Sequence, residues 1–518
     1  MTRGTACLNC WRRKVKCDGL RPTCGPCSKS STLNDCEYLE AGLPESQLLQ
    51  EKISILENRI QELQTSGHGA SSSTVQLHHP YSNQFEQSSS RGPEVNSSFL
   101  REFQAASPDR RRMIIMPFLS HASELGFFLD ISLFSSGVET GSCYPSPSLL
   151  SAVLLLADYV SHGGGANEAD FLALAVQSTS RGLTDSHPKM ILHTIQANIL
   201  LAHYFQLKGK SVEGQYYTST AVSLILGTGL HRIRSSDPGS MSGSHLPRPK
   251  DALEEGERIN AVWAVVALNS FWSAAGRYPS NIDHQLPASR VDAPWPLETP
   301  GYISEPLPHN LRSSHTILNF LSNVPDGAYS LPALYSKACL LFEQASILNY
   351  QYSPNMPTRE EGRQFSRSCD QLSAVLKRFN AELPSPSTAT TVPAQRRLLV
   401  IYTLSHVAVI QLHYAFVGQN ADSRRQVLST ANSIVKCLKS IGLQHFNGVI
   451  DPVFAVLLKI VGKVFIAELA SSAPSVDPRL LASSVELVMK AMSILGGPGS
   501  FMSSQATVLQ GKYTGIKR

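Results

Sequence analysis

The chain contains 518 residues, which is enough for about three domains of ordinary size. Hydrophobic residues make up 42% of it, so the chain can bury a sizeable core and wholesale disorder is excluded. The formal net charge is only +5, so any affinity for nucleic acid has to come from a local patch rather than from a globally basic surface.

The first 40 residues are dominated by cysteine, since six of the ten cysteines in the chain fall there. Their spacing is Cys7-x2-Cys10-x6-Cys17-x6-Cys24-x2-Cys27-x8-Cys36. A C-x2-C pair lets two thiolates converge on one cation, and zinc takes four such ligands in a tetrahedron. Two separate tetrahedra need eight sulfurs, whereas six are enough if two of them bridge both metals. The spacing therefore predicts two Zn2+ ions per chain within residues 1–40.

Two other uses of the cysteines were weighed against zinc. A disulfide framework is typical of short secreted chains. This chain is long, and its first residues show no apolar signal segment, so we expect a reducing compartment. An iron–sulfur site usually shows tighter C-x2-C-x2-C runs than the spacing found here. Both alternatives are therefore disfavoured.

Residues 7–36, CLNCWRRKVKCDGLRPTCGPCSKSSTLNDC, resemble the Zn2Cys6 binuclear cluster of fungal transcription factors. In that family the first and fourth cysteines bridge the two metals. The resemblance implies one zinc on Cys7, Cys10, Cys17 and Cys24, and the other on Cys7, Cys24, Cys27 and Cys36.

A basic run lies between Cys10 and Cys17, on what we expect to be a short helix held by metal at both ends: Arg12, Arg13, Lys14 and Lys16. A short helix fits the major groove, where Lys or Arg donates to guanine O6 and N7. The alternatives are a solvated charged surface or a nuclear-import signal. By resemblance, Lys14 and Arg13 read the bases of a CGG-like triplet, and Arg12 and Lys16 contact phosphates. Trp11 departs from the family, which usually has a basic residue there.

Residues 44–64 are predicted to form one helix with an apolar seam spaced 4, 3, 4, 3, made of Leu49, Ile53, Leu56, Ile60 and Leu63. Ile at a and Leu at d favours a parallel two-stranded coiled coil, and Lys52 and Glu57 form an attractive g–e′ pair. The stretch holds fewer than three full heptads, so an amphipathic helix packed on its own chain is the alternative.

Residues 65–98 are rich in Ser, Asn and Gln and are expected to be a disordered linker. Residues 99–515 are predicted to be all-α, because apolar residues recur at intervals of three and four there. The stretches are 148–162, 168–181, 188–207, 211–231, 257–275, 331–349, 362–382, 394–417, 424–441, 452–470 and 479–495.

Two segments of this region, Gly214–Arg232 and Glu257–Pro279, resemble the fungal-specific regulatory domain that accompanies such clusters. The predicted fold is thus a small N-terminal binuclear zinc cluster, a short coiled coil and a large all-α domain. The expected function is a nuclear, sequence-specific regulator of RNA polymerase II genes that binds double-stranded DNA, forms a homodimer and contacts the transcription machinery or co-regulators.

We expect no membrane partner, because the apolar runs are short and interrupted by charges. Catalytic motifs were also sought and none was found, so no enzymatic activity is expected. A zinc-stabilised interaction protein that binds DNA poorly and an all-α enzyme with a zinc-cluster appendage remain the alternatives.

Overall fold

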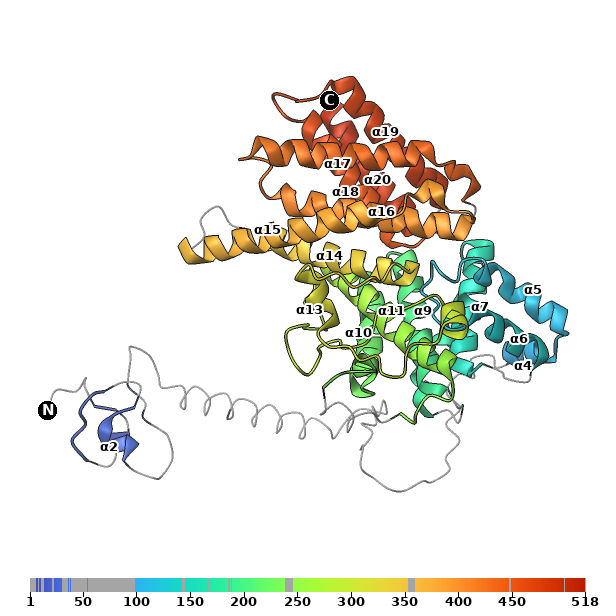
Figure 1. Ribbon diagram of the computed structural model, residues 1–518, viewed down its shortest axis with the longest axis horizontal. Coiled ribbons are helices and arrows are strands. Elements are labelled where there is room, and N and C mark those ends of the chain that lie inside the picture. The colour runs from blue at the N-terminus through green and yellow to red at the C-terminus, as the bar shows by residue number, and fades with distance from the viewer. Residues whose placement is uncertain are drawn as a thin grey trace, which may run out of the picture. The chain divides into compact units, whose positions relative to one another are not determined.

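A computed structural model of the chain is drawn in Figure 1. The structure describes residues 6–7, 9–10, 14–20, 23–29, 36, 38 and 54, and residues 98–517 except 142–144, 166, 185–186, 188, 238–245, 353–358, 447–448 and 498. The chain divides into two compact units, Met1–Ser90 and Arg91–Arg518.

In the N-terminal unit, the described residues include one short helix, α2 (Gly25–Ser28), and a helical turn at Asn9 and Cys10. Among the described residues of this unit, the buried apolar ones are Cys7, Cys10 and Cys24, each 1% exposed or less. Cysteine sulfurs thus occupy the place that a hydrophobic core takes in a larger domain. The predicted linker and coiled coil lie outside the described residues, apart from Ser54 and the linker's last residue, Ser98, which begins the next unit's first helix.

The described part of the C-terminal unit is helical throughout, and its single β-bridge pairs Ser235 with Ser313. The helices before the chain midpoint are α4 (Ser98–Ala105), α5 (Pro108–Leu119), α6 (Ile131–Thr140), α7 (Pro147–His162), α8 (Glu168–Ser180), α9 (Met190–Leu207), α10 (Ser211–Gly227) and α11 (Ala252–Gly276). The later helices are α12 (Thr299–Ser304), α13 (Thr316–Leu321), α14 (Leu331–Gln351), α15 (Arg359–Glu382), α16 (Val392–Tyr414), α17 (Ala421–Ser440), α18 (Val453–Leu469), α19 (Pro478–Leu495) and α20 (Phe501–Lys517). Short 3-10 turns lie at Gly182–Thr184, Leu230–Arg232, Pro386–Thr388 and Leu443–His445.

Helices that are neighbours along the chain also pack together in space. Helix α9 packs on α10 and α11, α11 packs on α14, and α14 packs on α16. Helix α16 in turn packs on α17 and α18, and α18 packs on α19 and α20. Figure 1 shows α16 to α20 gathered at one end of this unit and α5 to α9 at the other, with α11 and α14 between them.

Every helical stretch predicted from periodicity is a helix in the structure. The stretch 211–231 is interrupted, because Gly229 adopts a left-handed backbone (φ 74°) that ends α10 and begins a 3-10 turn. Periodicity missed α4 to α6, α12, α13 and α20. Helix α5 carries Pro117 and three consecutive arginines, and α12 and α13 have only 6 residues each, so none shows a long apolar stripe.

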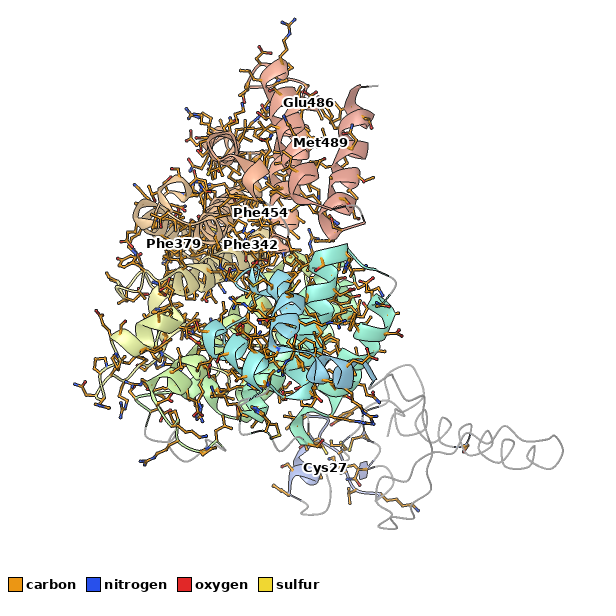
Figure 2. All side chains as sticks on the ribbon, turned by 90° about the vertical axis from the view of Figure 1, so that its right-hand side faces the viewer. Cys27, Phe342, Phe379, Phe454, Glu486 and Met489 are labelled. Carbon is orange, nitrogen blue, oxygen red and sulfur yellow. The ribbon has the colours of Figure 1, made fainter. Side chains whose placement is uncertain are left out.

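Helix α11 is the central element of the core. The Asp251 side chain caps its start by accepting the Glu254 N–H at 2.7 Å. Trp263, 1% exposed, donates its indole N–H to the Pro294 carbonyl at 2.6 Å and stacks on Trp295. Figure 2 shows Phe342 of α14 and Phe454 of α18 inside this packed interior.

By length and composition alone, α11 could cross a membrane, and it is the one described helix that meets both criteria. However, 83% of its most apolar window is buried inside the unit. The core of the unit thus accounts for the apolar character of this helix.

Candidate metal centre and its basic flank

Six cysteine sulfurs converge in the N-terminal unit. They form two groups of four whose sulfurs all lie within 4.8 Å of one another: Cys7, Cys10, Cys17 and Cys24, and Cys7, Cys24, Cys27 and Cys36. Cys7 and Cys24 belong to both groups, and their Sγ atoms are 3.7 Å apart. The pattern of sharing is the one that the family resemblance implied.

The sulfur spacing fits tetrahedral zinc. A Zn–S bond of about 2.3 Å places the sulfurs of a tetrahedron about 3.8 Å apart. The Sγ atom of Cys7 lies 3.7 Å from that of Cys27, and that of Cys10 lies 3.5 Å from that of Cys24. These separations are far longer than a disulfide bond of about 2.05 Å. The six-cysteine cluster therefore fits two Zn2+ ions, which would hold both halves of the unit together.

Backbone and side-chain donors point at several of these sulfurs. The Cys10 N–H donates to Cys7 Sγ at 3.4 Å, and the Cys24 N–H donates to Cys36 Sγ at 3.2 Å. The Asn9 amide also approaches Cys27 Sγ at 3.6 Å. Such N–H donors orient the ligands and spread the negative charge of the thiolates.

The carboxylate of Asp18 links the first half of the cluster to α2 in the second half. Its two oxygens accept the Gly25 N–H at 3.1 and 2.9 Å, at the start of that helix. A Cβ on Gly25 would lie only 2.4 Å from the Asp18 carboxylate, so a larger residue there would displace this side chain. The Tyr38 hydroxyl adds a further link by donating to the Leu20 carbonyl at 3.0 Å.

Burial and hydrogen bonding affect the acidity of the thiols unequally. Burial raises the pKa of Cys7 and of Cys24. Hydrogen bonding with the Cys7 backbone lowers the pKa of Cys17 to about 6. Six thiolates packed this closely repel one another, so a compensating cation is needed to keep the buried ones ionised.

The basic flank of the cluster is partly described. Lys14 and Lys16 are exposed, whereas Arg12, Arg13 and Trp11 lie outside the described residues. Sequence analysis placed Lys14 inside a helix, and this is wrong. Lys14 has a left-handed backbone (φ 54°), and the Val15 N–H donates to the Cys10 carbonyl at 3.0 Å.

That six-residue hydrogen bond around a left-handed residue is the arrangement that ends helices in the Schellman motif. Lys14 thus follows the helical turn begun at Asn9 and Cys10. Periodicity could not reveal this, because glycine normally marks such a position and the residue here is lysine.

The predicted dimerisation residues, Leu49, Ile53, Leu56, Ile60 and Leu63, all lie outside the described residues. The features that sequence analysis missed are the Asp18–Gly25 link and the Tyr38 hydroxyl. The Asp18-Gly19 pair was noted only as part of the family pattern, and its structural role depends on a contact seven residues away.

Comparison with known families gives two matches. Residues 5–42 match the model of the fungal Zn(2)-Cys(6) binuclear cluster domain. Residues 115–387 match the model of the fungal specific transcription factor domain, which covers more than half of the chain. No curated protein matches the chain.

Proposed function

The chain belongs to the fungal-specific transcription factors, and from this membership we propose that it is a nuclear regulator of RNA polymerase II genes that binds CGG-like half-sites as a dimer. The family consists of transcription regulators rather than enzymes, and its zinc cluster implies DNA binding. Target sequence, dimerisation and compartment are the proposed part.

The observation that carries the proposal is the pair of sulfur groups that share Cys7 and Cys24, beside the exposed Lys14 and Lys16. In the proposed arrangement each group holds one zinc and the two shared thiolates bridge the metals. A unit of about 40 residues has little core of its own, so metal binding supplies its folding free energy. The metal-bound cluster then holds the basic side chains on a rigid support.

Lys14 is proposed as the principal base reader, with Arg13 beside it, while Arg12 and Lys16 contact phosphates. The exposed position of Lys14 just beyond the helical turn supports this, since an exposed lysine side chain is free to reach a groove. A lysine that donates to guanine O6 and N7 contributes about 1–3 kcal/mol of discrimination between bases.

The test compares Lys14→Ala and Lys16→Ala in the full chain, on CGG duplexes and mutated-triplet duplexes across a salt series. Lys14→Ala should lose the preference for CGG. Lys16→Ala should weaken binding about equally on all duplexes and lower the salt slope by roughly one. Lys29→Ala, at an exposed lysine that follows α2, is the control and should change neither property.

If Lys14→Ala keeps full preference for CGG, base reading belongs to another residue, with Arg13 the next candidate. If the unmodified chain with two zincs binds no duplex above background, the alternative of a zinc-stabilised interaction protein replaces the proposal.

Dimerisation is proposed to run through residues 44–64, with residues 65–98 as the linker to a regulatory region at 99–515 that contacts co-regulators. Ile53→Asp with Ile60→Asp would place charges in the apolar seam. The double variant should sediment as a monomer and bind paired half-sites far more weakly than the unmodified chain does. Ser54→Asp with Asn58→Asp, at b and f positions outside both the seam and the g–e′ pair, is the matched charge change. A double variant that still dimerises would place the interface elsewhere.

A further inference from the structure

A cavity of about 330 Å3 lies where α9, α11, α14 and α16 meet in the helical unit. The loop between α5 and α6, the segment entering α12 and the residue Asp451 complete its wall. Most of the lining is apolar, including Trp263, Leu268 and Leu297. A mainly apolar cavity of this size with a few convergent polar groups is the usual form of a small-molecule site.

One polar group in the wall is a buried ion pair. Arg397 donates to Asp451 Oδ2 at 3.2 Å, and the Tyr335 hydroxyl donates to the same oxygen at 2.7 Å. The Arg397 guanidinium lies 3.5 Å from the centre of the Tyr335 ring. Burial raises the pKa of Asp451, while Arg397 and Tyr335 act against that rise by stabilising the carboxylate. With a permanently charged guanidinium in contact, the pair is ionised and carries no net charge.

The contact with Asp451 uses one N–H of a guanidinium that has five. The Arg397 side chain is 14% exposed and lines the cavity, whereas the Asp451 side chain is 1% exposed. Arg397 therefore lines the cavity with N–H donors beyond the one that Asp451 accepts, and such donors pair with an acceptor oxygen rather than with a further donor.

The second polar group is His203 of α9, which is 4% exposed. None of the described residues forms a hydrogen bond with its Nδ1 atom. Burial lowers the pKa of His203 to about 3, so the ring is neutral near pH 7. An unpaired buried polar atom costs about 1–3 kcal/mol, which a ligand group can recover.

The wall around His203 is fixed before any ligand arrives. Gly126 has a left-handed backbone (φ 71°), and a Cβ there would lie 2.8 Å from His203 Nε2. The buried Gln196 holds this loop by accepting the Phe128 N–H at 2.7 Å and donating to the Gly126 carbonyl at 3.1 Å. The imidazole therefore sits against a loop that is already ordered.

We propose that this cavity binds an uncharged, largely apolar small molecule that carries a carbonyl or ether oxygen, with the oxygen on the Arg397 guanidinium. A net-neutral ion pair disfavours a charged ligand, because a second buried charge would have no counter-charge. The lining comes from segments between residues 123 and 451, so a bound molecule contacts α9, α11, α14 and α16 at once. The proposal does not depend on the proposed DNA target.

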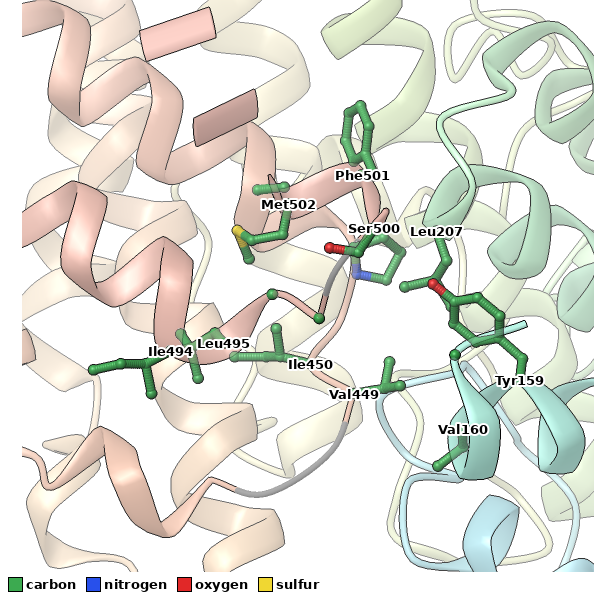
Figure 3. A pocket seen from close by; sticks show the side chains of 15 residues that line it. Tyr159, Val160, Leu207, Val449, Ile450, Ile494, Leu495, Ser500, Phe501 and Met502 are labelled. Carbon is green, nitrogen blue, oxygen red and sulfur yellow. The ribbon is translucent and has the colours of Figure 1, made fainter. Parts of the chain in front are cut away.

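A second cavity, of about 300 Å3, provides an internal comparison (Figure 3). Tyr159 and Val160 lie on one side of it, and Ile494 and Leu495 lie on the other. None of its described lining residues has a buried polar side-chain atom that lacks a hydrogen-bond partner. It is similar in size but lacks the charged pair, so it serves as the control site.

The test uses three probes of one shape on the full chain: 4-phenylbutan-2-one, butylbenzene and 4-phenylbutyrate. Saturation-transfer-difference NMR measures the affinity of each. The ketone should bind about tenfold more tightly than butylbenzene, because it adds one hydrogen bond to a charged donor. The carboxylate should bind no more tightly than butylbenzene.

Two filling variants locate the site. Ala264→Phe, on α11 in the cavity wall, should weaken ketone binding at least tenfold. Gly497→Phe fills the control cavity instead. Its Cβ meets nothing within 4 Å, and it should leave ketone binding unchanged. Arg397→Lys should reduce the preference for the ketone over butylbenzene, with thermal unfolding checked in parallel.

Three results would overturn the proposal. The first is that the carboxylate binds most tightly. The second is that no probe binds to the folded chain. The third is that Gly497→Phe rather than Ala264→Phe abolishes binding. Since none of these measurements uses DNA, their failure is separate from a failure of the proposed DNA recognition.

Discussion

The two units of this protein are each stabilised by a different kind of interaction. In the described part of the N-terminal unit the buried residues are cysteines whose sulfurs gather in two groups, whereas the described helical unit has one continuous apolar core. In the first unit the groups that specify the fold are also the groups that carry its chemistry. In the second, core residues specify the fold and polar groups drawn from distant segments line its cavity.

The largest effect should come from removing zinc, which acts on one unit only. Structural zinc sites contribute about 10–16 kcal/mol of folding free energy. A strong chelator should release two zincs per full chain and abolish DNA binding, while the thermal unfolding of the helical unit stays unchanged. Metal analysis and circular dichroism measure both outcomes. Release of a single zinc would contradict the two-metal arrangement, and joint unfolding would contradict the separation of the units.

The reciprocal change removes a core side chain from the helical unit. Phe342 is 1% exposed and stacks on Phe271 with ring centres 4.9 Å apart. Phe342→Ala should lower the free energy of unfolding of this unit by about 3–5 kcal/mol, measured by urea denaturation, with two zincs retained. Val508→Ala, at a side chain that is 46% exposed, is the control and should stay within about 0.5 kcal/mol. Loss of zinc from the Phe342 variant would show that the units are coupled.

Acid should weaken the helical unit through its buried histidines. Besides that of His193 and His203, burial lowers the pKa of His121, His231, His406 and His413. Burial lowers the pKa of His193 and of His203 to about 3, whereas an unfolded histidine has a pKa of about 6.5. Below pH 6.5 the unfolded chain takes up protons that the folded unit does not. The free energy of unfolding should therefore fall by about 1.4 kcal/mol per pH unit for each histidine, down to about pH 3.

Urea denaturation of the helical unit at several pH values between 7.5 and 5 measures this slope. His193→Gln should reduce it, because one of these protonations is removed. A helical unit that becomes more stable between pH 6.5 and 5.5 would contradict the assignment. Acid also acts on the cluster, but by protons competing with zinc for thiolates, and zinc release distinguishes that route.

The smallest effect is expected at the link between the halves of the cluster. Asp18→Ala removes the acceptor for the Gly25 N–H at the start of α2, which should cost about 0.5–2 kcal/mol. It should shift zinc release to lower chelator concentration without changing the two-zinc stoichiometry. Asp18→Asn keeps an acceptor oxygen, so it should release zinc at a chelator concentration between those of Asp18→Ala and the unmodified chain. Equal behaviour of Asp18→Ala and the unmodified chain would show that metal alone fixes this contact.

The same contrast explains what could be predicted from sequence. The metal ligands of the cluster follow a fixed spacing, so the sequence alone predicted its two-zinc chemistry. The long helices were predicted because their apolar stripes face one core. The left-handed backbone of Lys14 could not be predicted, because no residue type marks it. The cavity lined by Arg397, Asp451 and His203 could not be predicted either, because its residues come from separate helices and loops. Contacts between distant segments leave no local pattern.

The sharing of Cys7 and Cys24 by both sulfur groups also affects how the cluster fills and empties. If both metals bind the same two thiolates, the first ion to bind brings together two of the four ligands of the second. The first ion to leave likewise uncovers two ligands of the ion that remains. Loading then becomes cooperative, so a population of chains at limiting zinc would divide into full and empty molecules with few half-filled ones. Oxidation of either shared sulfur would likewise remove a ligand from both metals in a single event. A cluster of this kind responds to metal supply and to oxidants by changing between a fully loaded and an empty state.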